Sequence, residues 1–160
     1  MALTVSAWGG HTLTFREQNM LDAWMAQHSE IQLANDADCE CAESINDMKT
    51  GYGGNWTPVR DYHPYVATGD FNGDGARDFA VVVIDRKKPT KNFTLLVFNG
   101  PFNPGSGTPA FVKSDLGLRN QGLFFGPPRS KPYRLVLGRF ESDNSVILVP
   151  KGNTYILKAD

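Results

Sequence analysis

Residues 70–78 contain the side chains in this sequence that are best suited to chemistry, and they are typical of a metal site. Asp70, Asn72 and Asp74 alternate along the chain, and Asp78 follows four residues later. Calcium takes about six to eight hard oxygen ligands, mainly carboxylates and carbonyls. A tightly coiled loop turns alternate side chains toward one centre. The spacing therefore predicts a calcium-binding loop between two strands.

Two glycines in this loop favour the same interpretation. Gly73 and Gly75 permit backbone angles that a residue with a Cβ atom resists. The three carboxylates of the loop also repel one another unless a cation neutralises them. An ordinary polar hairpin turn is the alternative, because Asn-Gly and Asp-Gly are strong turn signals. Magnesium fits less well than calcium, because it takes fewer protein ligands and keeps its waters.

The loop resembles a known type of calcium site. Its first six positions are similar to an EF-hand loop, but Val81 stands where an EF-hand has a bidentate Glu. It resembles more closely the calcium loop of FG-GAP/VCBS repeats of integrin-type β-propellers, whose consensus is close to GDFNGDGxxDxAV. The resemblance covers one copy, at about residues 66–84. It implies metal ligands at the side chains of Asp70, Asn72, Asp74 and Asp78 and at the main-chain carbonyl of Ala76.

Two cysteines and a histidine form a weaker candidate site. Cys39 and Cys41 are separated by one residue, and His63 lies near Asp61 in the sequence. A small hydrolase using Cys39 or Cys41 with His63 is therefore an alternative function. Helical residues two apart point in nearly opposite directions, which disfavours a shared zinc ion or a second catalytic thiol. Because a disulfide between cysteines this close is strained, we expect buried thiols.

Aromatic residues and prolines precede the loop. We expect most of them in the core or supporting a loop, and a platform for a sugar or a peptide is the functional alternative. They are Trp56, Pro58, Tyr62, His63, Pro64 and Tyr65.

Length and composition indicate one globular domain spanning residues 1–160. No apolar run approaches the roughly 18 residues of a membrane-spanning helix. The net charge of −1 gives no signature of nucleic-acid binding. We therefore expect neither a membrane span nor a nucleic-acid partner.

Charge is distributed unevenly along the chain. Residues 1–80 contain 4 Lys and Arg against 12 Asp and Glu, whereas residues 81–160 contain 12 against 5. The simpler interpretation is that the two halves attract each other within the domain. The alternative is a basic face that meets an anionic partner, as in an inhibitor or immunity-type protein that binds a secreted enzyme. Arg86, Lys87, Lys88 and Lys91 cluster in a predicted hairpin loop.

Helical signals occupy about residues 14–50. Thr14 and Glu17 have the spacing of a capping box, which predicts a helix over about 15–29. Asp36 or Asp38 is a candidate cap for a second helix over about 39–49. The apolar positions predicted to face inward are Leu21, Trp24, Met25, His28 and Ile31 in the first helix, and Ala42, Ile45 and Met48 in the second, which Gly51 ends.

Strand signals occupy about residues 63–158. Short runs rich in β-branched and aromatic residues alternate with turn residues. Two helices packed on one face of a mainly antiparallel sheet of about six to seven meandering strands follow from this order, which is an α+β fold. The predicted strands are 65–68, 79–84, 93–98, 110–112, 133–137, 146–149 and 155–157.

The expected function is therefore non-enzymatic calcium binding that holds a hairpin together, and a supported surface for another protein is part of this expectation. Loops with few ligands bind calcium well only where it is plentiful, which favours a periplasmic or secreted, bacterial-type protein. The amino terminus shows no secretory signal, so the cytoplasm stays open as an alternative.

Overall fold

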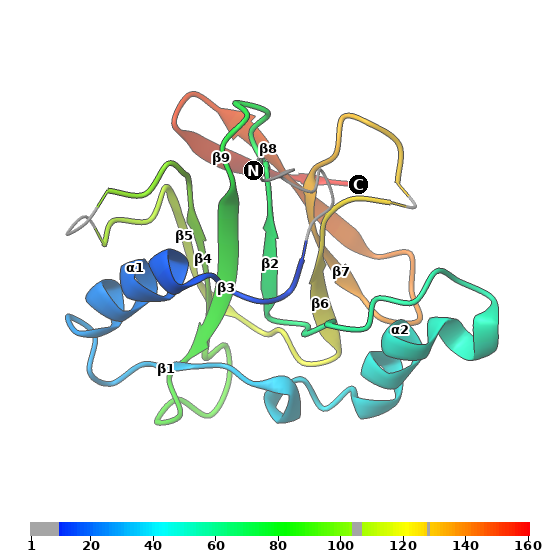
Figure 1. Cartoon of the computed structure of the whole chain (residues 1–160). Coiled ribbons are helices and arrows are strands. Elements are labelled where there is room, and N and C mark those ends of the chain that lie inside the picture. The colour runs from blue at the N-terminus through cyan, green and yellow to red at the C-terminus, as the bar shows by residue number, and fades with distance from the viewer. Residues whose placement is uncertain (1–9, 104–106, 128) are drawn as a thin grey trace.

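The computed structural model describes residues 10–103, 107–127 and 129–160. In these residues, nine strands form two antiparallel sheets, accompanied by two α-helices and one 3₁₀ helix (Figure 1). The α+β class is confirmed in this coarse form. The prediction of one sheet with six to seven strands is wrong, because the second half of the chain forms a separate sheet that packs against the first.

The first sheet has five strands. Its order is β1-β3-β4-β5, and β2 also pairs with β3. β2 pairs with the first half of β3 and β1 with its second half, so these two short strands share one edge of β3. The strands are β1 (Gln32–Leu33), β2 (Val66–Gly69), β3 (Asp78–Ile84), β4 (Phe93–Phe98) and β5 (Phe111–Leu116).

β3 is buried on both faces because the sheet is the middle layer of the domain. Alternate residues of a strand point to opposite faces. Phe79, Val81 and Val83 belong to the cluster that packs against α1. Ala80 and Val82 belong to the larger core between the two sheets. This central position explains why β3 is an almost continuous apolar run rather than an alternating one.

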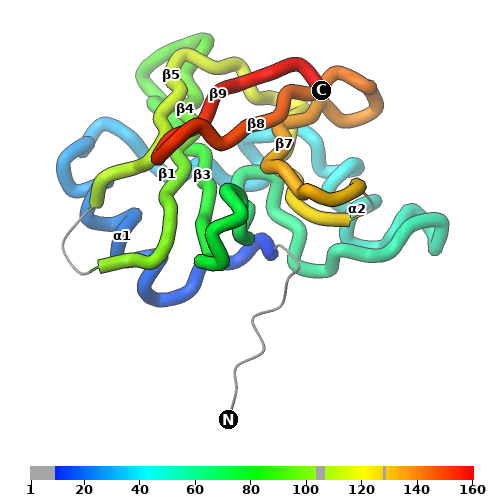
Figure 2. Tube along the Cα trace, turned by 90° about the horizontal axis from the view of Figure 1, so that it is seen from above, coloured from blue at the N-terminus to red at the C-terminus, as the bar shows by residue number. Residues whose placement is uncertain are grey.

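The second sheet is a four-stranded meander. Its order is β6-β7-β8-β9, and the predicted turns at 142–144 and 151–153 both connect antiparallel neighbours. The two sheets lie side by side where β5 and β9 begin (Figure 2). Thr154 Oγ1 at the start of β9 donates a hydrogen bond of 2.7 Å to the carbonyl of Ala110, the residue before β5. The strands are β6 (Gln121–Phe124), β7 (Leu135–Arg139), β8 (Ser145–Lys151) and β9 (Thr154–Ala159).

α1 (Phe15–Met25) covers the outer face of the first sheet, and its start is as predicted. Glu17 N donates to Thr14 Oγ1, and Glu17 Oε2 accepts from Thr14 N at 2.7 Å, which completes the capping box. Leu21 and Trp24 are buried against β3 and β4. The helix ends four residues earlier than expected.

The second predicted helix is two elements. Asn35, rather than Asp36 or Asp38, caps the short 3₁₀ helix η1 (Asp36–Cys39), and α2 (Ala42–Gly54) follows. Ile45 of α2 joins the core between the sheets, whereas Ala42 is exposed. The prediction that both helices cover one face is therefore wrong: α1 and α2 lie on opposite sides of the molecule in Figure 1.

Candidate metal centre

The predicted calcium loop connects β2 to β3 and is folded around the side chain of Asp70. Its Oδ1 accepts hydrogen bonds from the backbone N–H groups of Gly73 and Asp74 at 2.8 and 3.1 Å. Its Oδ2 accepts from Gly75 N at 2.9 Å. One carboxylate thus organises three amides of the loop, which is how a short Asx-type turn holds its shape.

Asn72 and Asp74 close the rest of the turn. Asn72 Oδ1 accepts from Asp74 N at 3.1 Å, and Asp74 Oδ1 accepts from Ala76 N at 2.8 Å. Gly73 and Gly75 have φ angles of +77° and +87°, so the expectation that they supply left-handed backbone conformations is confirmed.

Asp78 lies at the base of the loop with no exposed surface. Its Oδ2 accepts from Phe71 N at 2.7 Å, and its Oδ1 accepts from Gly100 N at 2.9 Å. Burial raises the pKa of this carboxyl to about 6, while the two amides oppose the shift and the charges of Asp74 and Asp70 add to it. The carboxylates of the loop therefore affect one another electrostatically.

Gly100 makes the contact with Asp78 possible. A Cβ at Gly100 would lie 2.2 Å from the carbonyl oxygen of Arg77, so only glycine lets this backbone approach the loop. Sequence reasoning did not identify Gly100, because nothing local connects it to a carboxylate 22 residues earlier.

An aromatic contact anchors the loop to the core. Phe71 is fully buried, and its ring meets the ring of Phe125 edge to face at 5.0 Å. The Phe125 ring also fills the place of a side chain at Gly69, where a Cβ would lie 2.4 Å away. Phe71, which follows the first predicted ligand Asp70, therefore has a packing role.

Arg77 is the one cation within the loop, and it turns away from the loop carboxylates. Its Nε donates to Glu17 Oε1 at 2.7 Å, and its Nη2 donates to the carbonyl of Thr12 at 3.1 Å. Glu17 is 1% exposed, so this pair ties the loop to the first turn of α1. Among the described residues, Asp70, Asp74 and Asp78 form no ion pair.

Tyr155 of β9 lies beside the loop. Burial raises the pKa of its hydroxyl above the ordinary value, and the charges of Asp78, Asp74 and Asp70 contribute to this shift. The hydroxyl donates to Asn99 Oδ1 at 2.6 Å. The loop therefore lies where the two sheets meet, next to the β8–β9 hairpin (Figure 1).

The donor chemistry of the loop fits a hard cation, since every predicted side-chain ligand offers oxygen. Within the described part of the chain, however, no three His, Cys, Asp or Glu side chains are gathered closely enough to hold a metal. Asp70, Asn72 and Asp74 come together in one turn, while Asp78 is directed by buried amides at its base. The ligand set, including the Ala76 carbonyl, stays a prediction.

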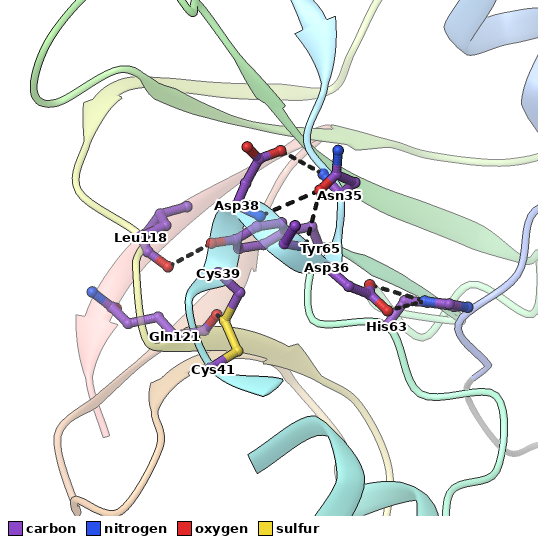
Figure 3. The surroundings of a disulfide bond; sticks show 10 residues. Asn35, Asp36, Asp38, Cys39, Cys41, His63, Tyr65, Leu118 and Gln121 are labelled. Carbon is purple, nitrogen blue, oxygen red and sulfur yellow. Dashed lines mark hydrogen bonds and ion pairs between the residues drawn. A yellow bond between two sulfur atoms is a disulfide. The ribbon is translucent and has the colours of Figure 1, made fainter. Parts of the chain in front are cut away.

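The expectation of free thiols at Cys39 and Cys41 is wrong, because the two sulfurs form a disulfide (Figure 3). The turn between η1 and α2 brings their Cα atoms within 5.1 Å, with Glu40 between them in a left-handed conformation. Neither cysteine can then act as a nucleophile with His63.

His63 pairs with a different carboxylate from the one nearest in sequence. Its Nδ1 lies 3.0 Å from both oxygens of Asp36 in η1 (Figure 3). Asp61 instead accepts a hydrogen bond from the backbone N–H of His11 at 3.2 Å. His63 thus links η1 to the segment that enters β2.

Ion pairs connect the acidic and basic halves of the chain. Arg86 donates to both oxygens of Asp38, and Arg119 lies 3.1 Å from Glu40. The basic 85–92 segment is the exposed loop between β3 and β4, as predicted. These contacts support the simpler interpretation, in which the halves attract each other.

Comparisons with protein-family models, curated proteins and solved structures found no match for this chain. A membrane-crossing helix, which would have to be long and apolar, is not found in the residues that the structure describes.

Proposed function

We propose that this protein is a calcium-binding domain whose metal holds the β2–β3 hairpin and the ends of both sheets together. The observation that carries the proposal is the unneutralised negative charge of the loop. It contains three carboxylates without an ion-pair partner among the described residues, and its own arginine pairs with Glu17 instead. A cation at the loop would relieve this repulsion.

The residues available to hold the ion are the side-chain oxygens of Asp70, Asn72, Asp74 and Asp78 and the carbonyl of Ala76. The calcium would supply charge neutralisation, with no chemical step. Asp78 accepts a hydrogen bond from Gly100, which follows β4, and the loop charges act on the hydroxyl of Tyr155 in β9. A bound ion would therefore stabilise the loop against these two segments. A surface for another protein beside the loop is part of the same proposal.

We place the protein in an extracytoplasmic compartment, periplasmic or secreted. Calcium loops with few ligands are occupied where calcium is abundant. The Cys39–Cys41 disulfide supports this placement, since disulfides persist in oxidising compartments and are rare in the cytosol.

The test is unfolding by heat and by urea, first in chelator and then with excess calcium. A ligand bound only to the folded state at about 100 times its dissociation constant adds roughly 2.7 kcal/mol to the free energy of unfolding. We expect this gain in the wild type, its loss in Asp74→Ala and no comparable gain with magnesium. Asp143→Ala is the matched control, because it removes an exposed carboxylate from the β7–β8 turn.

No gain in a wild-type protein shown beforehand to be free of metal would contradict the proposal. An equal gain in wild type and Asp74→Ala would place the ion elsewhere. A general salt effect would also stabilise Asp74→Ala, and direct titration by calorimetry separates such an effect from binding of the ion.

A further inference from the structure

An exposed pair of aromatic rings lies at the end of α2. Tyr52 and Trp56 are 53% and 54% exposed, and their rings stack with centroids 5.2 Å apart and planes 23° apart. Each ring covers part of the other, and about half of each residue is still exposed to solvent. Two large aromatic side chains this exposed are uncommon where no ligand or partner uses them.

The backbone holds this pair in place. Gly51, Tyr52 and Gly53 have φ angles of +73°, +49° and +64°, a left-handed turn that is unfavourable for tyrosine. The turn is closed by a hydrogen bond of 2.9 Å from Trp56 N to the carbonyl of Gly51. A Cβ at Gly51 would lie 2.3 Å from the carbonyl oxygen of Trp56, so glycine is required there.

The segment that carries the rings is polar and uncharged, and charged residues flank it at Lys49 and Arg60. Residues 50–59 include no Asp, Glu, Lys, Arg or His. Asn55 Nδ2 donates to the carbonyl of Tyr52 at 2.9 Å, and no described residue hydrogen-bonds to its Oδ1. Gly53 and Gly54 have open space where a side chain would be, so nothing on them blocks an approach to the rings.

The patch is too small for an ordinary protein interface, which covers about 800 Å² on each partner. The other exposed large apolar residues are on different elements: Phe15 on α1, Leu33 on β1 and Val112 on β5. A charged ligand would find no opposite charge in residues 50–59. An apolar ring face bordered by neutral hydrogen-bonding groups matches the chemistry of a sugar ring, which has apolar C–H faces and hydroxyl groups on its rim.

We propose that Tyr52 and Trp56 form a binding site for a neutral carbohydrate, in which a sugar ring stacks on the open face of Trp56 and Tyr52 supports the indole from behind. Asn55 Oδ1 accepts a hydrogen bond from a sugar hydroxyl. This site is separate from the calcium loop, so the proposal does not rest on metal binding.

The test is native electrophoresis of the full chain in gels that contain one soluble polysaccharide each. The neutral polymers are xyloglucan, galactomannan, arabinoxylan, laminarin and soluble starch, and the charged ones are heparin and polygalacturonate. We expect retardation by at least one neutral polymer, in chelator as well as in calcium. Calorimetry with oligosaccharides of that polymer then gives the affinity.

Three variants and a matched control identify the site. Trp56→Ala is expected to weaken binding about tenfold or more, as truncation of a central aromatic contact does. Tyr52→Ala is expected to cause a smaller loss, and Tyr52→Phe to retain affinity because the stacking ring remains. Phe15→Ala is the control, since it removes an aromatic ring that is 81% exposed on another element.

Retardation by none of the neutral polymers would overturn the proposal. The same holds for retardation by the charged polymers alone, or for equal affinity in wild type and Trp56→Ala. Binding that disappears in chelator would assign the sugar to the metal loop instead. Because both aromatic side chains are exposed, circular dichroism and the unfolding midpoint are expected to match the wild type, which separates lost binding from lost folding.

Discussion

The turn at residues 35–41 and the loop at residues 70–78 are shaped by similar hydrogen bonds. They differ in how the negative charges of their carboxylates are neutralised. In each, a side-chain oxygen of Asn35 or Asp70 accepts backbone N–H groups and shapes the turn. The first turn is closed by a disulfide, and its carboxylates each face a cation: Asp36 faces Lys49, Asp38 faces Arg86, and Glu40 faces Arg119.

The loop at residues 70–78 has neither a disulfide nor, among the described residues, an ion pair to its carboxylates. It has no covalent closure, and among the described residues its carboxylates have only backbone amides and one side-chain amide as partners. A turn whose carboxylates pair with cations of the same chain needs no ligand, whereas a turn whose carboxylates lack such partners can bind an external cation. In this molecule, charge balance rather than turn geometry distinguishes the structural turn from the candidate metal site.

The largest expected effect concerns the buried carboxylate at the base of the loop. Asp78→Ala leaves the N–H groups of Phe71 and Gly100 without acceptors, and two such buried groups cost about 3 kcal/mol of the free energy of unfolding. Asp38→Ala, in the other turn, is the control and should cost less because its partners reach solvent. Urea unfolding in chelator measures both variants, and equal losses would remove the distinction between the two regions.

The pH dependence of unfolding tests the same carboxyl. Its pKa is about 6 in the folded protein against an ordinary 3.8, so the folded state keeps a proton that the unfolded chain releases. The free energy of unfolding therefore falls as pH rises from about 4 to about 6, by roughly 2 to 3 kcal/mol for a shift of this size. Urea unfolding in chelator at several pH values should show this slope in wild type and not in Asp78→Asn. The same slope in both would assign it to other groups.

Removing the disulfide is expected to have a smaller effect. Because Cys39 and Cys41 close a loop of only three residues, the chain-entropy model gives about 1.5 kcal/mol for the covalent link. The paired change Cys39→Ala with Cys41→Ala should lower stability by this amount and leave calcium binding unchanged. Wild type in reducing agent is the control. A loss of calcium affinity in the alanine pair would show that the two regions are coupled.

The smallest expected effects come from the arginines that tie each region to the rest of the domain. Arg77→Ala leaves the buried Glu17 without its cation, but Glu17 keeps the Thr14 N–H and water can replace the half-exposed arginine, so the cost is about 1 kcal/mol. Arg86→Ala removes the exposed pair with Asp38 and should cost less. Thermal unfolding at low and high salt checks the order, since the exposed pair alone should weaken strongly with salt. The opposite order would contradict the anchoring role of Arg77.

Elements with local signals could be predicted from the sequence. The capping box at Thr14 and Glu17 is a contact between residues three apart, so its spacing was sufficient to place the start of α1. The strong apolar runs of β3 and β4 likewise predicted strands, since burial on both faces leaves an unmistakable composition. β6 was missed because Gln121–Phe124 is short and contains Gly122, which is needed where the Tyr62 hydroxyl packs closely.

The candidate site was predictable in part for the same reason. The hydrogen bonds of the loop join residues two to five positions apart, so the local sequence predicts their arrangement. They involve Asp70, Asn72, Asp74 and the two loop glycines. The hydrogen bond from Gly100 to Asp78 and the pairing of Arg77 with Glu17 depend on other strands and on α1. No local pattern indicates such contacts.

Local sequence is sufficient to predict the loop that connects β2 to β3, because Asx side chains and glycines form their hydrogen bonds within a few residues. Packing of the whole chain determines that Asp78 is buried, that Arg77 pairs with Glu17 60 residues earlier in the sequence, and that the strands divide into two sheets. The physical reason is that burial and ion pairing depend on which distant surfaces meet. Local hydrogen bonds shape a turn, whereas packing between layers decides which of its charges are left for a ligand.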